Sequence, residues 1–430
     1  QCETPLVRTP PVTGRPWSLA AADEVAATPL GLYIHVPFCE RRCGYCAFNT
    51  YTASDLPGNS RRNYVEAAIA ETILAASVIG EATGSARPAL ETVYLGGGTP
   101  TVLSVDEIGR ILASVKASFE TRDGIEITIE ANPDGLDLEY LRGLRQLGIN
   151  RISFGMQSTS RRVLNLLDRT HDPLLALRAV DDAHEAGFEH VSLDLIYGTP
   201  GELLADFNAS LNSAIATGVD HISAYALGIE SGTKLAARVR SGALPRPSDD
   251  EAAERYTLAD DTLSAAGFSW YELSNWALTP ESRSQHNLLY WANANWWGIG
   301  PGAHSHLSGV RWWNKNHPSV WADPLLGSSD GSHVGGYEHL DAEQRRLEHV
   351  MLGIRLASGL AVDDSLDRSA IDRLVDQGLI TVVHGLGDVG SNIRGQAPFG
   401  AGNSCPNNLD RLVLTRQGRL LADHVVGKLT

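Results

Sequence analysis

The stretch "HVPFCERRCGYCAFN" (residues 35–49) places three of the chain's five cysteines within eight residues, namely Cys39, Cys43 and Cys46. The other two cysteines are isolated, so the chain lacks the dense pairing of a disulfide framework. Clustered thiolates favour an iron–sulfur cluster, zinc or copper. Structural zinc usually takes two pairs of ligands, and no second pair exists here. The spacing therefore predicts three ligands of a 4Fe-4S cluster with one iron left open, and three buried structural cysteines are the alternative.

Composition sets broad limits on what the chain does. It has 430 residues, of which 43% are hydrophobic and 20% are charged, which is typical of a globular protein with two or three domains. The formal net charge of −16 argues against a dedicated nucleic-acid binder, which would present a basic face. We find no apolar run long enough for a membrane span and no apolar signal-peptide core, so we expect a cytoplasmic protein.

Apolar strands alternate with helices from the cysteine loop to about residue 227. The expected strands are "GLYIHV" (31–36), "ETVYLGGGTP" (91–100), "GIEITIEANP" (124–133), "NRISFGMQS" (150–158), "HVSLDLIYGTP" (190–200) and "HISAYAL" (221–227). Six strands linked by helices predict an α/β fold with a parallel sheet curled into a partial barrel. Ligand-binding groups in such folds gather at the carboxyl ends of the strands, where the cysteine loop and the Gly-rich turns fall.

Two of these strand ends carry recognisable motifs. "GGGTP" (96–100) lets backbone amides approach a ligand because its glycines have no Cβ, although a simple tight turn is the alternative. "EANP" places Glu130 at a strand end, where its carboxylate can accept hydrogen bonds from two ribose hydroxyls, unless it is a surface glutamate. These motifs predict that a polar ligand lies beside the cysteine loop.

The loop "CERRCGYC" (39–46) resembles the CxxxCxxC loop of the radical SAM superfamily, and "LYIHVPFC" (32–39) is similar to its coproporphyrinogen-oxidase-like branch. The resemblance implies a partial (β/α)6 barrel whose cluster binds the amino and carboxylate groups of S-adenosylmethionine at its open iron. It also implies that an electron from the cluster cleaves the sulfonium bond of this cofactor. We expect the cofactor to contact a set of residues that match the family's positions, namely Tyr33, Tyr45, Gly97, Gly98, Thr99, Glu130, Gln157, Arg169 and Asp194.

Some of these roles have plain alternatives. Gln157, Arg169 and Asp194 match positions used in the family around a second S-adenosylmethionine, but a structural polar network would use the same residue types. Tyr33 and Tyr45 match cofactor-contacting positions, and packing explains an aromatic there equally well.

The branch contains two main families that the sequence helps to distinguish. Oxygen-independent coproporphyrinogen III dehydrogenases typically carry a fourth loop cysteine where this chain has Phe48. The "CAFN" end of the loop and "HNLLYW" (286–291) resemble instead the heme-chaperone family HemW, in which an HNxxYW motif is proposed to bind heme. His286 is therefore the expected heme ligand, with His304 and His306 as the next candidates and a core histidine as the alternative.

The resemblance also predicts the order of domains. They are a disordered or uncertain extension at 1–16, the barrel at 17–240, a HemW-type central extension at 241–335 and a winged-helix-like domain at 336–430 with a flexible loop at 384–408. Cys405 in that loop is expected to be an inert exposed thiol rather than a reactive thiol or a further metal ligand.

Three functions from different classes remain in view. The favoured one is a chaperone that binds heme and transfers it to hemoproteins of the respiratory chain, carrying the cluster and S-adenosylmethionine without dehydrogenase activity. The second is coproporphyrinogen III oxidation, against which Phe48 and the HNLLYW motif argue. The third is a radical enzyme acting on RNA or another substrate, against which the acidic charge and the lack of an RNA-binding appendage argue. The sequence leaves open whether the chain forms a homodimer.

Overall fold

The computed structural model describes residues 15–56, 60–169, 171–384 and 410–430. The predicted N-terminal extension, except its last two residues, and the predicted loop after His384 lie outside these ranges. Cys2 and Cys405 lie outside them too, so their expected roles stay predictions.

The predicted parallel sheet is confirmed. Its strands are β1 (Leu30–Val36), β2 (Ala89–Gly97), β3 (Glu120–Ala131), β4 (Arg151–Gln157), β5 (His190–Tyr197) and β6 (His221–Ala226). Each strand pairs in parallel with the next one along the chain. Parallel strands need crossover connections, and helices supply them. These helices are α2 (Ser60–Thr83), α3 (Val105–Ser118), α4 (Leu138–Gln146), α5 (Arg161–Leu166), α6 (Leu175–Ala186) and α7 (Leu204–Ala216).

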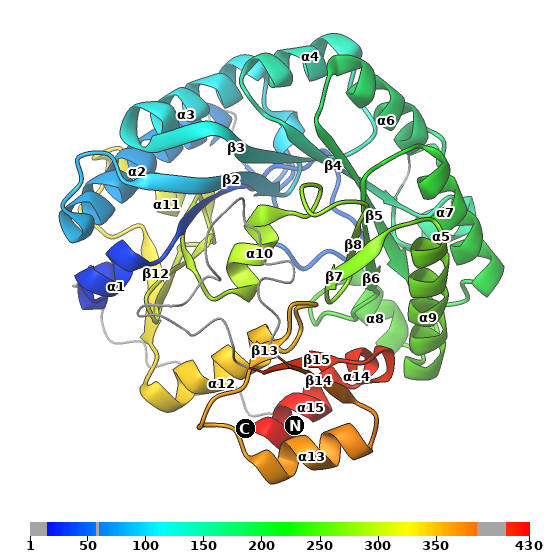
Figure 1. Cartoon of the computed structure of the whole chain (residues 1–430). Helices are drawn as coiled ribbons and strands as arrows, with labels where there is room; N and C mark the ends of the chain where they lie inside the picture. Colours follow the sequence, from blue (N-terminus) through cyan, green and yellow to red (C-terminus); the bar gives the residue numbers. More distant parts are fainter. Residues whose placement is uncertain (1–14, 57–59, 170, 385–409) are drawn as a thin grey trace.

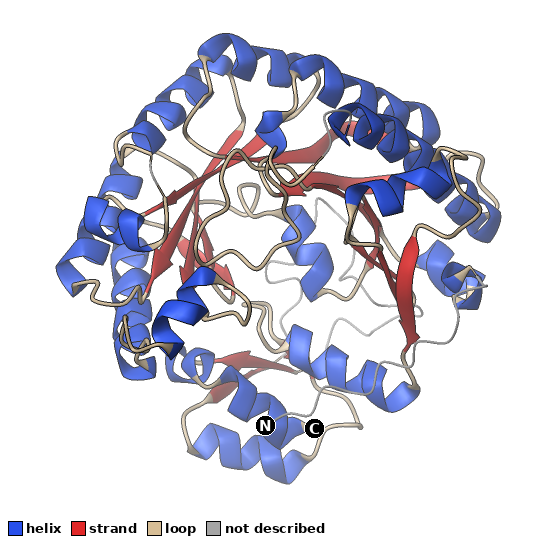
Figure 2. Ribbon diagram, turned by 180° about the vertical axis from the view of Figure 1, so that it is seen from behind, coloured by secondary structure: helices blue, strands red, loops and turns tan. Residues whose placement is uncertain are grey.

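The sheet curves, and the crossover helices cover its outer face (Figures 1 and 2). Helix α3 shows why these segments fold and pack as they do. Its N-cap Ser104 forms a capping box with Glu107, which satisfies backbone N–H groups at the start of the helix. Its buried residues recur at helical spacing and face the sheet, and they are Ile108, Ile111, Leu112 and Val115.

The predicted central extension continues the same sheet at both of its edges. Among the described residues, one sheet has twelve strands in the order β12-β11-β10-β9-β1-β2-β3-β4-β5-β6-β8-β7. The added elements are α8 (Lys234–Arg240), α9 (Asp249–Ala265), β7 (Ser269–Glu272), β8 (Asn275–Ala277), α10 (Gln285–Trp291), β9 (Asn295–Ile299), β10 (His304–Leu307), β11 (Val310–Asn314), α11 (Pro318–Leu325) and β12 (Val334–His339). Strand β9 is parallel to β1, and helix α10 lies within the curve of the sheet (Figure 1).

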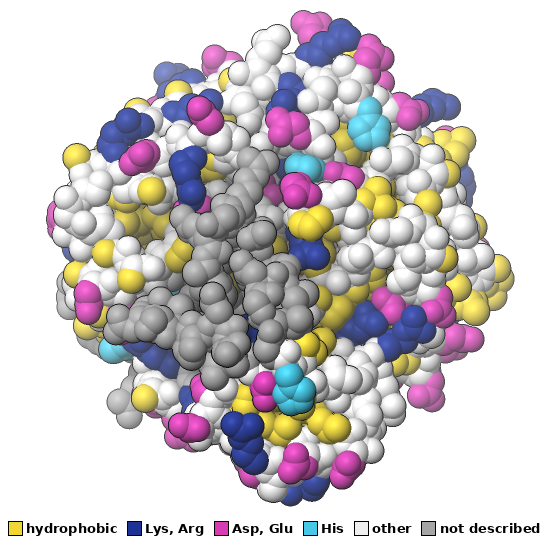
Figure 3. Space-filling view, viewed as in Figure 1, with side chains coloured by type: hydrophobic (Ala, Val, Ile, Leu, Met, Phe, Trp, Pro, Cys, Tyr) yellow, Lys and Arg dark blue, Asp and Glu magenta, His cyan; other side chains and the backbone are white. Residues whose placement is uncertain are grey.

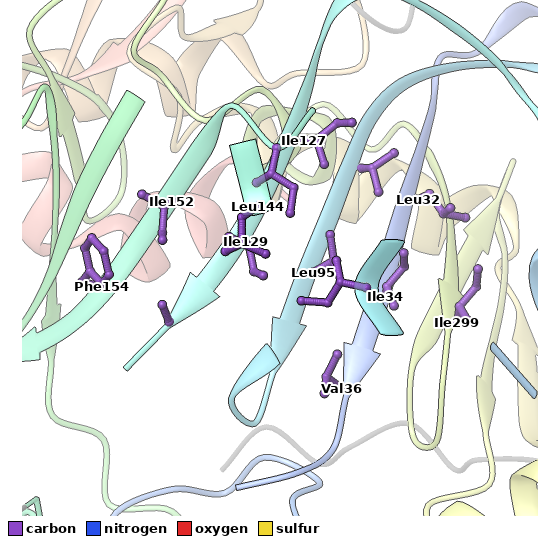
Figure 4. Packing of buried hydrophobic residues seen from close by; sticks show 14 of the residues in the cluster. Leu32, Ile34, Val36, Leu95, Ile127, Ile129, Leu144, Ile152, Phe154 and Ile299 are labelled. Carbon is purple, nitrogen blue, oxygen red and sulfur yellow. The ribbon is translucent and has the colours of Figure 1, made fainter. Parts of the chain in front are cut away.

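Three short helices lie outside the regular alternation of strands and helices, two before β1 and one after β2. They are the 3-10 helices η1 (Pro16–Leu19) and η2 (Pro100–Val102) and the helix α1 (Ala22–Ala27). The strand side chains that face the covering helices form one continuous hydrophobic core with them. Part of this core is shown in Figure 4, including Leu32, Ile34, Leu95, Ile129 and Ile152.

The C-terminal region packs around a hydrophobic core of its own. Its elements are α12 (Ala342–Gly353), β13 (Leu360–Ala361), α13 (Arg368–Asp376), β14 (Ile380–Val383), β15 (Arg411–Leu414), α14 (Arg416–Leu420) and α15 (Ala422–Leu429). The strands form a small antiparallel sheet in the order β13-β15-β14. The helices confirm the predicted mainly helical character of this region, and its winged-helix-like arrangement stays a prediction.

On the face shown in Figure 3, acidic and basic side chains are interspersed. Within the described ranges, we find no helix with the length and apolar character that a membrane crossing requires.

Candidate functional site

A cavity of about 520 Å³ opens at the carboxyl ends of strands β1 to β6. Because the carboxyl ends of parallel strands meet at one edge of the sheet, motifs far apart in sequence converge there. The predicted residues that line the cavity are Cys39, Cys43, Cys46, Tyr45, Gly97, Gly98, Thr99, Glu130, Gln157, Arg169 and Asp194. Tyr33 and His286 are not among its lining residues.

The three clustered cysteines are free thiols, each half-buried at the cavity wall. Burial raises the pKa of the Cys39 thiol to about 11 and also raises the pKa of Cys43. Among the described residues, no three His, Cys, Asp or Glu side chains are arranged to ligate a single metal ion. A 4Fe-4S cluster takes each thiolate on a different iron, so these three thiols fit a cluster better than one ion.

The Asn49 end of the cysteine loop is anchored to β1 and to two segments distant in sequence. His35 in β1 contacts the Asn49 carbonyl through Nε2 at 2.9 Å and the Tyr33 hydroxyl through Nδ1 at 3.0 Å. The Asn49 amide donates to the carbonyls of Pro301, at 2.9 Å, and Asn316, at 2.8 Å. The asparagine of "CAFN" therefore fixes the end of the loop to segments more than 250 positions away.

Backbone hydrogen bonds of Gly44 hold the middle of the cysteine loop. Its N–H donates to the Leu167 carbonyl at 3.1 Å, and its carbonyl accepts from the Leu235 N–H at 2.9 Å. A Cβ at Gly44 would lie 2.6 Å from Oδ2 of Asp168, so only glycine fits this approach without a shift of that side chain. The loop is thus pinned between the end of α5 and the start of α8.

The Gly-rich turn after β2 packs directly beneath the cysteine loop. The N–H groups of Gly98 and Thr99 donate to the carbonyls of Val36 and Phe38, both at 2.8 Å. A Cβ at Gly98 would lie 2.6 Å from the Phe38 carbonyl oxygen and 3.0 Å from Sγ of Cys39. The missing Cβ therefore allows close contact with the loop, in addition to the contact with a ligand that the sequence suggested.

Glu130, at the end of β3, faces the cavity through a carboxylate that two donors already orient. The Tyr94 hydroxyl donates to Oε1 at 2.8 Å and the Gly97 N–H donates to Oε2 at 3.0 Å. Burial raises the pKa of this carboxyl to about 6, against the opposing effect of the Tyr94 hydrogen bond. Each oxygen retains a lone pair for a further donor such as a ribose hydroxyl.

A chain of hydrogen bonds runs from Arg169 to the first cysteine. The Arg169 guanidinium donates to Oδ1 of Asn132 at 2.5 Å, and the Asn132 amide donates to the Thr99 hydroxyl at 3.1 Å. That hydroxyl in turn contacts Sγ of Cys39 at 3.8 Å. Arg169 also bonds to Tyr45, and its Nε has no hydrogen-bond partner among the described residues. A cation therefore lies where the charge of thiolates or of a ligand carboxylate would be stabilised.

Gln157, the last residue of β4, and Asp194, within β5, complete the wall. Gln157 is buried and has a φ of 63°, a left-handed conformation that costs free energy for a residue other than glycine. Asp194 accepts hydrogen bonds from Ser153, at 3.0 Å, and from Ser223. Burial raises the pKa of Asp194, so its carboxylate needs these donors to remain charged.

Sequence reasoning missed several polar residues that line the cavity, among them Tyr94, Asn132, Thr128, Arg151 and His221. Arg151 is 2% exposed, and its Nη1 has no hydrogen-bond partner within the described ranges. Its signal in the sequence is a single charge at the start of a fully buried strand, "RISFGMQ". Asn132 could have been found from its place in "EANP", two positions after Glu130.

His286 lies inside the curve of the sheet, 1% exposed, rather than at the cavity. Its Nδ1 lies 2.7 Å from the Thr92 hydroxyl and its Nε2 lies 2.8 Å from the Tyr290 hydroxyl. Burial lowers the pKa of His286 to about 3, which keeps the imidazole neutral. Tyr33 stacks on the same ring at a centroid distance of 6.4 Å. Ligation of iron by His286 would require one of its two hydrogen bonds to open.

The two other candidate histidines differ in accessibility. His306 is buried, and its ring nitrogens contact the Ala294 carbonyl and the Gly309 N–H, both at 2.9 Å. His304 is exposed and stacks on Trp313 at a centroid distance of 5.7 Å. His304 is therefore the more accessible imidazole of the pair.

Comparisons with known proteins place the chain in a family. The model of the Radical SAM superfamily matches residues 33–214. A protein named heme chaperone HemW from Mycobacterium tuberculosis (strain ATCC 25618 / H37Rv) is 43% identical over 413 residues, which cover 96% of this chain and 97% of that protein. Heme chaperone HemW from Bacillus subtilis (strain 168) is 31% identical and covers 92% of this chain and 97% of its own length.

A solved structure shares the fold over nearly the whole chain. Coproporphyrinogen III oxidase (HemN) from Escherichia coli, described as a radical SAM enzyme, superposes with a TM-score of 0.73 at 21% sequence identity. The superposition covers 95% of this chain and 92% of that one, which confirms the predicted fold class. The sequence identities of 43% and 31% to these relatives extend over nearly the whole chain. This chain therefore belongs to the radical SAM superfamily and, within it, to the HemW family.

Proposed function

We propose that this protein is a heme chaperone that binds heme and transfers it to hemoproteins of the respiratory chain. In this proposal, a 4Fe-4S cluster on Cys39, Cys43 and Cys46 and a molecule of S-adenosylmethionine occupy the cavity. The observation that carries the proposal is the 43% identity, over 96% of the chain, to a relative named heme chaperone HemW. Membership of the radical SAM superfamily implies the cluster and the cofactor.

The residues around the cavity suit the two implied groups. The thiols supply the cluster ligands, and Glu130 is oriented to accept hydroxyl donors. Arg169 supplies a cation close to the cysteine loop, while Asp194 supplies an acceptor on the far wall. Bound cluster and cofactor would supply one-electron chemistry, and the chain's own side chains bind, orient and shield them from water.

The cysteine loop favours the chaperone over coproporphyrinogen III oxidation. Phe48 occupies the position where the dehydrogenases of the same branch typically carry a fourth cysteine. For the heme iron, His286 is one proposed ligand, at the cost of a hydrogen bond to Thr92 or Tyr290. The exposed His304 offers an imidazole without that cost. We place this activity in the cytoplasm, where a reducing environment keeps clustered thiols free.

The decisive assay mixes the reconstituted protein with heme and, separately, with coproporphyrinogen III. We expect heme to produce a saturable Soret shift, and coproporphyrinogen III to yield no decarboxylated product in the presence of reductant and S-adenosylmethionine. His286→Ala and His304→Ala, measured side by side, assign the iron ligand by the change in the Soret band. Decarboxylation above background, or the absence of saturable heme binding, would overturn the proposal.

A further inference from the structure

Phe48 is an apolar side chain in an unexpected place. It is 67% exposed, although it lies in the anchored cysteine loop and lines the cavity. Single exposed apolar residues are common on protein surfaces, but an exposed aromatic at the mouth of a cavity is typical of a binding surface. The proposed cluster and cofactor leave Phe48 without a role.

Two arginines stand beside Phe48 in the same loop. Arg41 and Arg42 are exposed and line the cavity. Arg42 donates through Nε to the Thr50 hydroxyl at 3.3 Å and through Nη2 to the Thr50 carbonyl, which holds its guanidinium in place. Arg41 makes no hydrogen bond or ion pair within the part of the chain that the structure describes. In a chain with a net charge of −16, this pair forms a cationic edge that attracts anions locally.

A second group of apolar side chains lines the cavity at the carboxyl end of β6. Tyr225, at the end of β6, is 42% exposed and lines the cavity together with Ala226 and Leu227. Strands β1 and β6 are the outermost of the parallel run β1 to β6 in the order of the sheet. The cavity is therefore lined by one partly exposed aromatic on the β1 side, Phe48, and one on the β6 side, Tyr225, with the arginines beside Phe48.

The size of the cavity places a large ligand at this mouth rather than inside. A volume of about 520 Å³ lies within the range of roughly 300–1,000 Å³ that is typical of a single small-molecule site. S-adenosylmethionine and the open iron of the cluster would fill it. A flat macrocycle could then lie only across the entrance, where exposed aromatic surface is available.

We infer that the mouth formed by Arg41, Phe48 and Tyr225 is the heme site, with Phe48 against the macrocycle and Arg41 paired with a propionate. This inference rests on the proposed function and names the part of the molecule that binds heme. His286 does not line the cavity, so a heme bound here does not use it as the iron ligand. Heme combines an apolar plane with two carboxylates at one edge, and the mouth combines aromatic faces with two guanidinium groups. Arginine pairs with carboxylates through charge-assisted hydrogen bonds, so the propionate edge sets the orientation of the ring.

The first test changes the ligand and leaves the protein intact. Wild-type reconstituted protein is titrated with heme and with heme dimethyl ester, in which both carboxylates are masked. We expect the ester to bind about tenfold or more weakly, because it forms no charge-assisted hydrogen bond to the arginines. Equal affinity for heme and its ester would overturn the inference.

The second test changes the protein. Arg41→Glu and Phe48→Ser should each weaken heme binding by about tenfold or more, and Arg41→Glu should also remove the preference for heme over the ester. Matched controls are Arg178→Glu on α6 and Leu203→Ser before α7, which are exposed and outside the cavity lining. These controls should bind heme like the wild type.

The outcomes separate the inference from the proposed function. If the wild type binds no heme, the proposed function fails. If it binds heme but neither loop variant differs from its control, the function stands and the heme site lies elsewhere. Iron and sulfide are measured on each variant to check that the cluster is present. If a variant loses its cluster, the wild-type comparison of heme with heme dimethyl ester decides whether the inference holds.

Discussion

At the scale of single residues, burial works against the charged form of the groups around the cavity. It raises the pKa of the Cys39 thiol to about 11 and the pKa of the Glu130 carboxyl to about 6. Desolvation without a full set of partners is unfavourable for a thiolate or a carboxylate. In the proposed function, the thiolates would gain their compensating partners from the cluster, and Glu130 would gain them from donors on the cofactor. The electrostatics of the cavity therefore favour its occupied state.

The thiol ligands provide the first prediction. Cys39→Ala, Cys43→Ala and Cys46→Ala should each abolish the 4Fe-4S cluster, because three protein ligands leave none to spare. Iron and acid-labile sulfide per chain, with the visible absorption of the cluster, provide the measurement. Cys2→Ala and Cys405→Ala are the controls and should retain a full cluster. A full cluster in any of the first three variants would contradict the ligand assignment.

Glu130 provides the second prediction. Glu130→Ala should weaken S-adenosylmethionine binding by about 1.5–3 kcal/mol, the range for hydrogen bonds to a charged group. Calorimetric titration of the cluster-loaded protein measures this loss. Glu120→Ala, at the exposed start of the same strand, is the matched control. Unchanged affinity in Glu130→Ala would mean that this carboxylate supports the Gly-rich turn through Gly97 and does not touch the cofactor.

At the scale of elements, one buried carboxylate joins α2 to the segment that supports the cysteine loop. Glu71 is fully buried and accepts hydrogen bonds from the Gly300 N–H (2.9 Å), the Asn314 amide (2.8 Å) and the Trp321 indole (2.9 Å). The adjoining Pro301 carbonyl accepts from Asn49 at the end of the cysteine loop. Glu71 thus helps to position that loop without reaching the cavity.

Glu71 also predicts a pH dependence of stability. Burial raises its pKa from the ordinary 4.5 to about 7, so the folded state binds this proton more tightly than the unfolded state. Its contribution to the free energy of unfolding therefore falls as pH rises from 4.5 through about 7. His333 faces Glu71 at 3.6 Å and stays neutral in this window, because burial lowers its pKa to about 4.

Glu71→Gln should remove this dependence. Between about pH 5 and pH 8, the free energy of unfolding of the variant should gain about 2–3 kcal/mol relative to the wild type. Urea denaturation at several pH values measures it. Glu66→Gln on the same helix is the control, since Glu66 is half-exposed and pairs with Arg110. Parallel curves of stability against pH for the wild type and Glu71→Gln would refute the assignment.

At the scale of the whole molecule, a buried carboxylate connects the large sheet to the C-terminal region. Asp260 in α9 is 5% exposed at its side chain and accepts from Arg416, Arg419 and the Trp276 indole. Arg419 also lies over the Trp270 ring at 4.5 Å from its centroid. The two hydrophobic cores are separate, so these contacts hold the C-terminal region against the barrel.

Two neighbouring aspartates allow a paired test of this contact. Asp260→Ala leaves two guanidinium groups without their shared partner and should destabilise the protein by about 3–5 kcal/mol. Asp261→Ala removes an exposed ion pair to Arg416 and should cost less than about 1 kcal/mol. Hydrogen exchange should show lost protection in β14, β15 and α14 for Asp260→Ala alone. Equal effects of the two variants would show that Asp260 does not connect the two regions.

The sequence by itself determined the cluster loop, the parallel run of strands and most of the cavity wall. The cluster loop and Glu130 depend on local signals, namely the cysteine spacing and a polar motif at a strand end, whereas Gln157, Arg169 and Asp194 were predicted from the resemblance to the family. In a parallel sheet the carboxyl ends of the strands share one edge, so the placement of each motif on its strand was enough to predict that they converge. That rule needs no knowledge of long-range contacts.

Only the tertiary structure decided the rest. The pairing of β9 with β1, the burial of His286 between Thr92 and Tyr290, and the turn of Arg151 toward the cavity depend on residues distant in sequence. A histidine in HNLLYW has the same local pattern whether it faces a ligand or the core. Its environment is set by which strands pack around α10, and that packing depends on the free energy of the whole sheet rather than on any local segment.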